Sequence, residues 1–216
     1  MNSRFNIATC TFGMIVLLVA TSNPAQAKFY AHAYVRPIVQ YTTLVNQASS
    51  RSEIVSIDPR FGGGVGAGAV FGKRERFELG AEITSIRFDG KYWVGYNATT
   101  RTTSYDKVDY QVTPFLVTFR YYFRDKDAAI RPYLGGFWGI YDLETSRSYE
   151  SKSGIGFTAG IGGGVSFNLG GKVSLDVGYR YIESTEAIEG SSYLWVTGSD
   201  FSYTAHVLSM GLNVRF

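Results

Sequence analysis

Charged residues interrupt several stretches of the chain that are otherwise apolar, aromatic or rich in glycine. If the fold encloses these charges, each needs an opposite partner, because an unpaired buried charge is very costly. Their spacing predicts two ion-pair clusters, which could line a gated pore or fill a plugged core. One cluster is expected from Glu78, Glu82 and Arg120, and the other from Asp176, Arg180 and Arg215.

His206 follows Thr204 and Ser202, an arrangement that raises the hypothesis of a hydrolase. A nucleophile and its base must lie within hydrogen-bond distance, with an acid nearby to orient the base. Side chains two residues apart on one face of a strand start roughly 7 Å apart. The spacing therefore favours interfacial packing of His206, and no catalytic residue is predicted.

No pattern for a metal or a cofactor is found. The second histidine, His32, is expected to be a hydrogen-bonded interior residue, and no Cys, His and Asp residues have the spacing of metal ligands. The segment Gly64-x-Gly66-x-x-Ala69 loosely fits a dinucleotide-binding pattern. That chemistry requires a helix directly after the glycines, and none is expected here.

Charge and composition exclude other classes. The 216 residues have a net charge of +3 and no basic stripe, so nucleic acid is not an expected partner. Residues 1–27 contain a basic start at Arg4, an apolar run with the only cysteine, Cys10, and the cleavage pattern Ala25-Gln-Ala27. They predict a signal peptide, followed by a barrel domain over residues 28–216.

The elements that would position the charges are eight strands, because apolar residues alternate with polar residues or glycine. The alternation slips at Ile86 and Phe88, which suggests a bulge or an early loop. The predicted strands cover about residues 29–41, 60–71, 76–88, 110–123, 131–142, 154–169, 172–182 and 202–216.

The connections between these strands alternate in length. Residues 72–75, 124–129 and 169–171 form short turns, whereas residues 42–59, 89–109, 143–153 and 183–200 are long. Short turns at one end and long loops at the other are typical of outer-membrane barrels. Outward-facing aromatics at the short-turn ends (Phe71, Phe77, Phe123, Phe167 and Phe216) indicate an interfacial girdle. The predicted fold is an all-β, eight-stranded antiparallel up-and-down transmembrane β-barrel.

A barrel of eight strands is only wide enough to be filled by its own side chains. The inward faces carry the charges, several large rings, and glycines over residues 62–68 and 154–164, on which those large side chains could lie. We therefore expect a packed lumen. Aromatic residues in the long loops are candidates for surface contacts: Tyr92, Trp93, Tyr96, Tyr193 and Trp195.

The segments 114–123, 131–141 and 176–181, together with the last strand, resemble the small eight-stranded bacterial outer-membrane β-barrel family. This is the type of OmpX, Ail, the opacity proteins and the OmpA membrane domain. In the last strand, the spacing of Gly211, Val214 and Phe216 resembles the closing-strand signal read by the barrel-assembly machinery.

The resemblance implies an integral protein of the cell outer membrane. The expected partners are outer-membrane lipid and lipopolysaccharide, the assembly machinery, and a host or cell-surface ligand held by four extracellular loops. A monomer without enzymatic activity or cofactor is expected, with a role in adhesion or envelope integrity. The alternatives are a small channel or transporter for apolar molecules, and a lipid A-modifying hydrolase.

Overall fold

The computed structural model describes residues 31–48, 54–57, 60–97, 102–147, 150–185, 188–189 and 202–216. The predicted signal peptide lies outside the described residues. The strands are β1 (Ala31–Ala48), β2 (Ile54–Ile57), β3 (Arg60–Phe71), β4 (Phe77–Asn97), β5 (Thr102–Tyr122), β6 (Ile130–Arg147), β7 (Glu150–Gly170), β8 (Val173–Ser184), β9 (Ile188–Glu189) and β10 (Ser202–Arg215).

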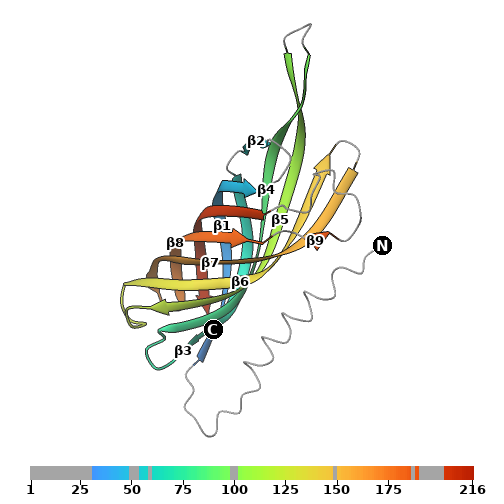
Figure 1. Cartoon of the computed structure of the whole chain (residues 1–216). Coiled ribbons are helices and arrows are strands. Elements are labelled where there is room, and N and C mark those ends of the chain that lie inside the picture. The colour runs from blue at the N-terminus through green and yellow to red at the C-terminus, as the bar shows by residue number, and fades with distance from the viewer. Residues whose placement is uncertain are drawn as a thin grey trace.

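Eight of these strands form a closed antiparallel barrel (Figure 1). Each long strand pairs with the next long strand along the chain, and β10 closes the ring by pairing with β1. The seam runs from Tyr34 opposite Arg215 to Ala48 opposite Ser202, with one irregularity between Leu44 and Asn46. The short strands β2 and β9 lie outside the ring, on β4 and β7. The predicted eight-stranded barrel is thereby confirmed.

Alternation along each strand sorts side chains between the lipid-facing wall and the lumen. On β7, Ile155 and Ile161 are 57% and 66% exposed on the outside, whereas Thr158 and Ser166 point inward and are buried. The last strand follows the same rule, with Leu208 and Met210 outside and Ser209 inside. The large outward residues are apolar because their neighbours in the membrane are acyl chains.

The structure corrects the expected break after Ile83. Strand β4 keeps its register with β5 from Phe77 to Trp93, so Ile86 and Phe88 lie inside the barrel. The apolar residues move from odd to even positions because the lumen becomes apolar at this height. The strand has no bulge there. The first irregularity of this pair lies between Trp93 and Gly95.

The strands also extend beyond the predicted boundaries. β4 and β5 each have 21 residues, and their hairpin rises far above the rest of the barrel (Figure 1). Most of the predicted long loop over residues 89–109 is therefore strand. A tilted membrane strand needs only roughly 9–11 residues, so much of this hairpin stands outside the bilayer.

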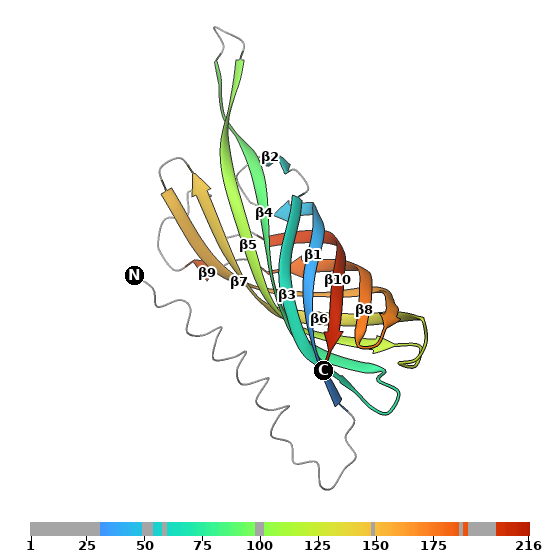
Figure 2. The same ribbon diagram turned by 180° about the vertical axis from the view of Figure 1, so that it is seen from behind.

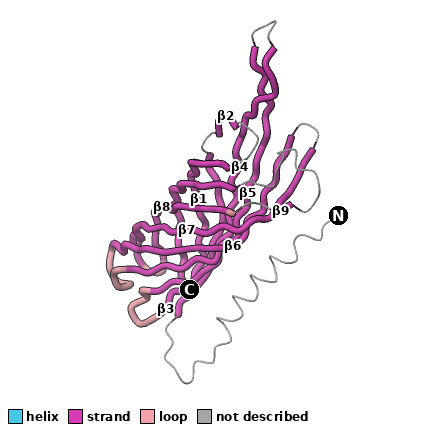
Figure 3. Tube along the Cα trace, in the orientation of Figure 1, coloured by secondary structure: helices cyan, strands magenta, loops and turns pink. Residues whose placement is uncertain are grey.

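The short turns lie together at the end of the barrel where β10 finishes (Figures 2 and 3). Glycines with positive φ shape two of them, Gly72 at +87° and Gly171 at +57°. In outer-membrane barrels short turns face the periplasm, which sets the orientation of the chain. Phe77, Phe123, Phe167 and Phe216 are exposed near this end, as the girdle requires.

Among the described residues, no helix is long and apolar enough to cross a membrane.

Candidate functional site

The lower half of the lumen, nearer the periplasm, holds a buried network centred on Glu78. The Oε1 atom of Glu78 accepts hydrogen bonds from Arg36 Nη2 at 2.8 Å and from the Tyr34 hydroxyl at 3.0 Å. The Oε2 atom accepts one from the Tyr122 hydroxyl at 2.7 Å. Arg120 Nε lies 3.6 Å from Oε1. Glu78 is 1% exposed, so its charge is balanced by protein groups alone.

Asp176 completes this network from the opposite wall. Its Oδ2 atom lies 2.8 Å from Arg120 Nη1 and 3.3 Å from Arg36 Nη2. Asn213 bridges the two sides, because it accepts from Arg36 Nε and donates to Asp176 Oδ2, each at 2.8 Å. Two guanidinium groups thus meet two carboxylates, and the lower layer is electrically neutral.

A separate bidentate pair lies next to this network. Arg180 Nη1 and Nη2 donate to the two carboxylate oxygens of Glu82, at 2.5 and 2.9 Å. These residues are on β8 and β4, so the pair spans the lumen. Such fork-to-fork contacts combine two charge-assisted hydrogen bonds in one geometry.

The observed partners match the predicted ones only in part, since Arg120 does lie near Glu78. Glu82 pairs with Arg180 and not with Arg120, while Asp176 pairs with Arg120 and Arg36. Arg36 was missed as a member, although its position on the inward face of β1 is readable from the alternation. Parity places a residue on a face, but the tilt of the strands decides which charges lie at one height.

Arg215 belongs to another cluster, at the periplasmic mouth. Its Nη1 atom lies 3.0 Å from Glu75 Oε2, and His32 Nδ1 lies 2.9 Å from Glu75 Oε1. Arg131 donates to the backbone carbonyl of Glu75. His32 does have a hydrogen-bond partner, but its side chain is 45% exposed and so lies at the rim. Glu75 joins the ends of β1 and β10 to the turn before β4.

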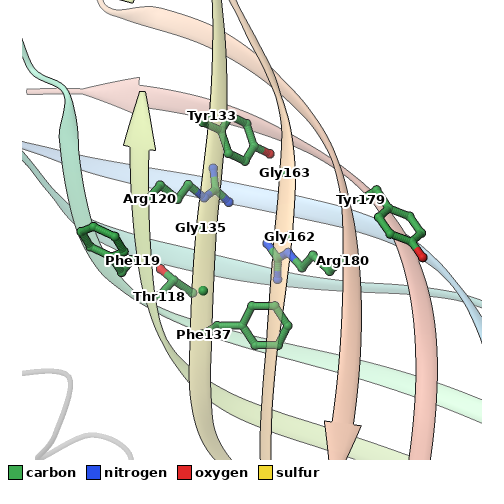
Figure 4. A pocket seen from close by; sticks show the side chains of 11 residues that line it. Thr118, Phe119, Arg120, Tyr133, Gly135, Phe137, Gly162, Gly163, Tyr179 and Arg180 are labelled. Atoms are coloured by element: carbon green, nitrogen blue, oxygen red, sulfur yellow. The ribbon is translucent and has the colours of Figure 1, made fainter. Parts of the chain in front are cut away.

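Glycines provide the space for these long side chains. A Cβ atom at Gly162 would lie 2.7 Å from the Tyr179 carbonyl oxygen and 2.9 Å from Arg180 Cγ. One at Gly135 would clash with the Phe119 carbonyl oxygen and lie 3.1 Å from Arg120 Cγ, so neither position admits a side chain. Figure 4 shows both arginines reaching across these strands, between Tyr133 and Phe137. The cavity beside them measures about 20 Å³, which is room for one or two water molecules.

The upper half of the lumen is apolar, which the charges and glycines expected on the inward faces did not indicate. It is filled by Ile86, Phe88, Tyr110, Val112, Leu116, Phe137, Tyr141, Leu143, Ile182, Tyr203, Ala205 and Val207. All are buried, and the Tyr141 and Tyr203 rings meet edge to face at 5.3 Å. The barrel is thus filled by two layers of different chemistry.

His206 lies on the outer wall, where it contacts two tyrosines. Its ring stacks on Tyr179 with centroids 5.7 Å apart, and its Nδ1 atom hydrogen-bonds the Tyr179 hydroxyl. The Tyr181 ring also packs against His206, with centroids 5.6 Å apart. Within the described contacts, neither Ser202 nor Thr204 bonds to His206. The geometry is that of interfacial packing and does not form a nucleophile–base pair.

The remaining predicted residues divide into two groups. Gly211, Val214 and Phe216 lie on or directly after β10, where Val214 pairs with Val35 and the Phe216 amide donates to Ala33. Tyr92, Trp93 and Tyr96 belong to the extended part of β4, but their side chains lie outside the described residues. Tyr193 and Trp195 lie wholly outside them.

In the described part of the chain, no group of three or more His, Cys, Asp or Glu side chains is arranged to hold a metal ion.

Comparisons with known proteins agree with this architecture. Among solved structures, the Neisserial surface protein A has 17% identity and a TM-score of 0.56, over 87% of this chain and 99% of its own. Outer membrane protein H of Pseudomonas aeruginosa also has 17% identity, with a TM-score of 0.48 over 86% and 99%. The similarity to the Neisserial protein shows the fold alone.

No curated protein sequence matches the chain. A family model for the outer membrane protein beta-barrel domain matches residues 12–216, which is nearly the whole sequence. The protein therefore belongs to the outer membrane protein beta-barrel domain family, and it is a protein of the cell outer membrane.

Proposed function

We propose that the protein is a closed, non-enzymatic barrel that holds its long hairpins above the outer membrane for adhesion or for envelope integrity. The observation that carries this proposal is the filled lumen. The neutral charge network and the apolar cluster occupy successive heights of the same narrow interior. A solute would have to displace paired charges and packed rings together.

The hairpins supply the second argument. β4 and β5 remain paired out to Asn97 opposite Thr102, and β6 and β7 out to Arg147 opposite Glu150. Such paired extensions are more rigid than loops of the same length. Rigid display lowers the conformational entropy lost on binding, which suits a surface that contacts another cell or molecule.

A cell-adhesion assay tests this function. We expect binding of expressing cells to host cells or matrix to fall when the β4–β5 hairpin is shortened at the pair Lys91 and Lys107. The matched control shortens the β6–β7 hairpin at Ser146 and Ser151, and it shows whether a protein with a shortened hairpin still reaches the cell surface. Equal adhesion by cells that lack the protein altogether would refute adhesion as its role.

The aromatic residues allow a finer version of this test. We expect the triple variant Tyr92→Ser, Trp93→Ser and Tyr96→Ser to reduce adhesion as much as the shortened hairpin does. The triple variant Thr102→Ala, Thr103→Ala and Ser104→Ala changes the partner strand and is expected to leave adhesion unchanged. Envelope integrity is tested separately, through the sensitivity of deletion cells to detergent.

Liposome swelling separates this function from the transport alternative. Vesicles containing the folded protein are expected to swell no faster in small solutes than protein-free vesicles. Entry of apolar or small polar solutes at a rate proportional to protein content would favour a channel or transporter.

A further inference from the structure

The two ends of the barrel differ in charge. Residues 72–76, 123–132, 170–172 and 215–216, at the short-turn end, contain eight Lys or Arg and three Asp or Glu. The connections at the other end contain eight Lys or Arg and twelve Asp or Glu, over residues 49–60, 87–109, 142–153 and 183–201. The small net charge of the whole chain therefore conceals a basic periplasmic end.

The acidic residues at the short-turn end are mostly engaged. Glu75 is buried and paired with Arg215, and Asp125 accepts from Arg76 Nε at 2.7 Å. The hydrogen bond from Arg76 to Asp125 raises the pKa of the Arg76 guanidinium above its usual value. Asp127 is exposed, and it is the only acidic residue of this end that forms no ion pair among the described residues.

Three cations at this end are exposed and form no ion pair among the described residues: Lys73, Arg124 and Lys172. Each comes from a different short turn, between β3 and β4, β5 and β6, or β7 and β8, and these turns lie at one end of the barrel (Figure 2). Arg124 directly follows the exposed Phe123, and Lys73 lies close in sequence to Phe77. Aromatic rings of a girdle lie at the level of the headgroups, so these cations reach the phosphates.

We propose that Lys73, Arg124 and Lys172 form a basic collar that binds the phosphate groups of anionic phospholipids in the periplasmic leaflet. Each Lys or Arg near an anionic membrane surface strengthens binding by about fivefold. Exposed, unpaired side chains lose little when they exchange water for a lipid phosphate. This inference depends on insertion in the outer membrane and is independent of the role of the hairpins.

Native mass spectrometry tests the proposal by measuring how much of each lipid stays bound to the folded protein. The protein is prepared in mixed micelles that contain equal amounts of phosphatidylglycerol and phosphatidylcholine. We expect several-fold enrichment of phosphatidylglycerol, roughly fivefold or more at low salt. The triple variant Lys73→Ser, Arg124→Ser and Lys172→Ser should bind the two lipids equally. The charge-preserving variant Lys73→Arg, Arg124→Lys and Lys172→Arg should retain the enrichment.

A control variant at the other end, Arg60→Ser with Arg87→Ser, should also retain it, because these exposed cations already contact Asp89 and Gln111. Increasing NaCl should remove the enrichment from the wild-type protein, which tests the proposal even if a variant does not fold. Equal binding of both lipids by the wild type would overturn the proposal. So would enrichment that survives the triple serine change, or that is lost only in the Arg60 and Arg87 control.

Isolated peptidoglycan is the remaining acidic polymer near this surface. Retention on peptidoglycan that requires the three cations, without any lipid preference, would assign the collar to that polymer and refute the lipid site.

Discussion

The lower and upper layers of the lumen fill the same barrel by different means. In the lower layer, Arg36, Glu78, Arg120 and Asp176 neutralise one another through directed ion pairs. In the upper layer, Val112, Leu143 and their neighbours fill space without directed bonds. The polar layer depends on every member because each lost partner leaves a buried charge. The apolar layer loses only the packing of the atoms removed.

This difference predicts that the largest single effect lies in the lower layer. Glu78→Ala removes one of the two carboxylates that neutralise Arg36 and Arg120, and it removes the acceptor of two tyrosine hydroxyls. We expect the free energy of unfolding to fall by roughly 3–5 kcal/mol. Urea titration of the protein in phospholipid vesicles measures it. The exposed Glu144→Ala should change stability by less than about 0.5 kcal/mol. Equal effects of the two variants would contradict the role of the network.

The upper layer should respond to a loss of volume. Leu116→Ala leaves a cavity between buried neighbours and is expected to cost about 2–5 kcal/mol in the same titration. Leu208→Ala, on the lipid-facing wall, is the matched control and should cost less, because acyl chains can occupy the space. If the outward change is the more harmful, the upper layer is not a packed core.

The inward-facing glycines give a smaller effect with a clear sign. At Gly164 a Cβ atom would clash with the backbone carbonyl oxygen of Val177 and would lie 2.7 Å from the Tyr133 hydroxyl. Gly164→Ala should therefore displace the neighbouring strand as well as that ring, and cost about 1–3 kcal/mol. Gly136 faces outward, and its Cβ would meet nothing closer than the Gly160 carbonyl at 3.6 Å. Gly136→Ala should therefore be neutral or stabilising. The reverse order would remove the steric reason for the inward glycines.

The smallest effect is expected outside the lumen. Arg60 and Asp89 form an ion pair whose side chains are 46% and 49% exposed. The double variant Arg60→Ser with Asp89→Ser should change the free energy of unfolding by less than about 1 kcal/mol. A double-mutant cycle on this pair measures the coupling. A large coupling energy would show that burial does not distinguish this exposed ion pair from the buried ion pairs of the lumen.

The sequence predicted the closed barrel, the inward charges and the outward girdle, because alternation with period two determines the face of each residue. It did not predict the apolar upper layer, since Ile86 and Phe88 look like lipid-facing residues that have slipped by one position. It also assigned Glu82 and Arg215 to the wrong partners. Those contacts depend on the heights that strand tilt gives to residues far apart in the chain.

The sequence pattern also did not predict how far the hairpins extend. Residues 89–109 lack the regular alternation of apolar and polar residues seen in the barrel strands, which resembles a loop, yet Asp89 lies opposite Asp109 and the pairing continues outward. Outside the membrane a paired strand has no need of an apolar face, so the pattern that reveals the barrel strands disappears there.

The central claim is that two layers close the lumen, and planar-bilayer recording tests it most directly. The folded wild-type protein should produce no steady conductance steps in salt solution at moderate voltage. Stable, reproducible single-channel steps from the purified wild-type protein would show that the lumen conducts, and would contradict the filled barrel described above.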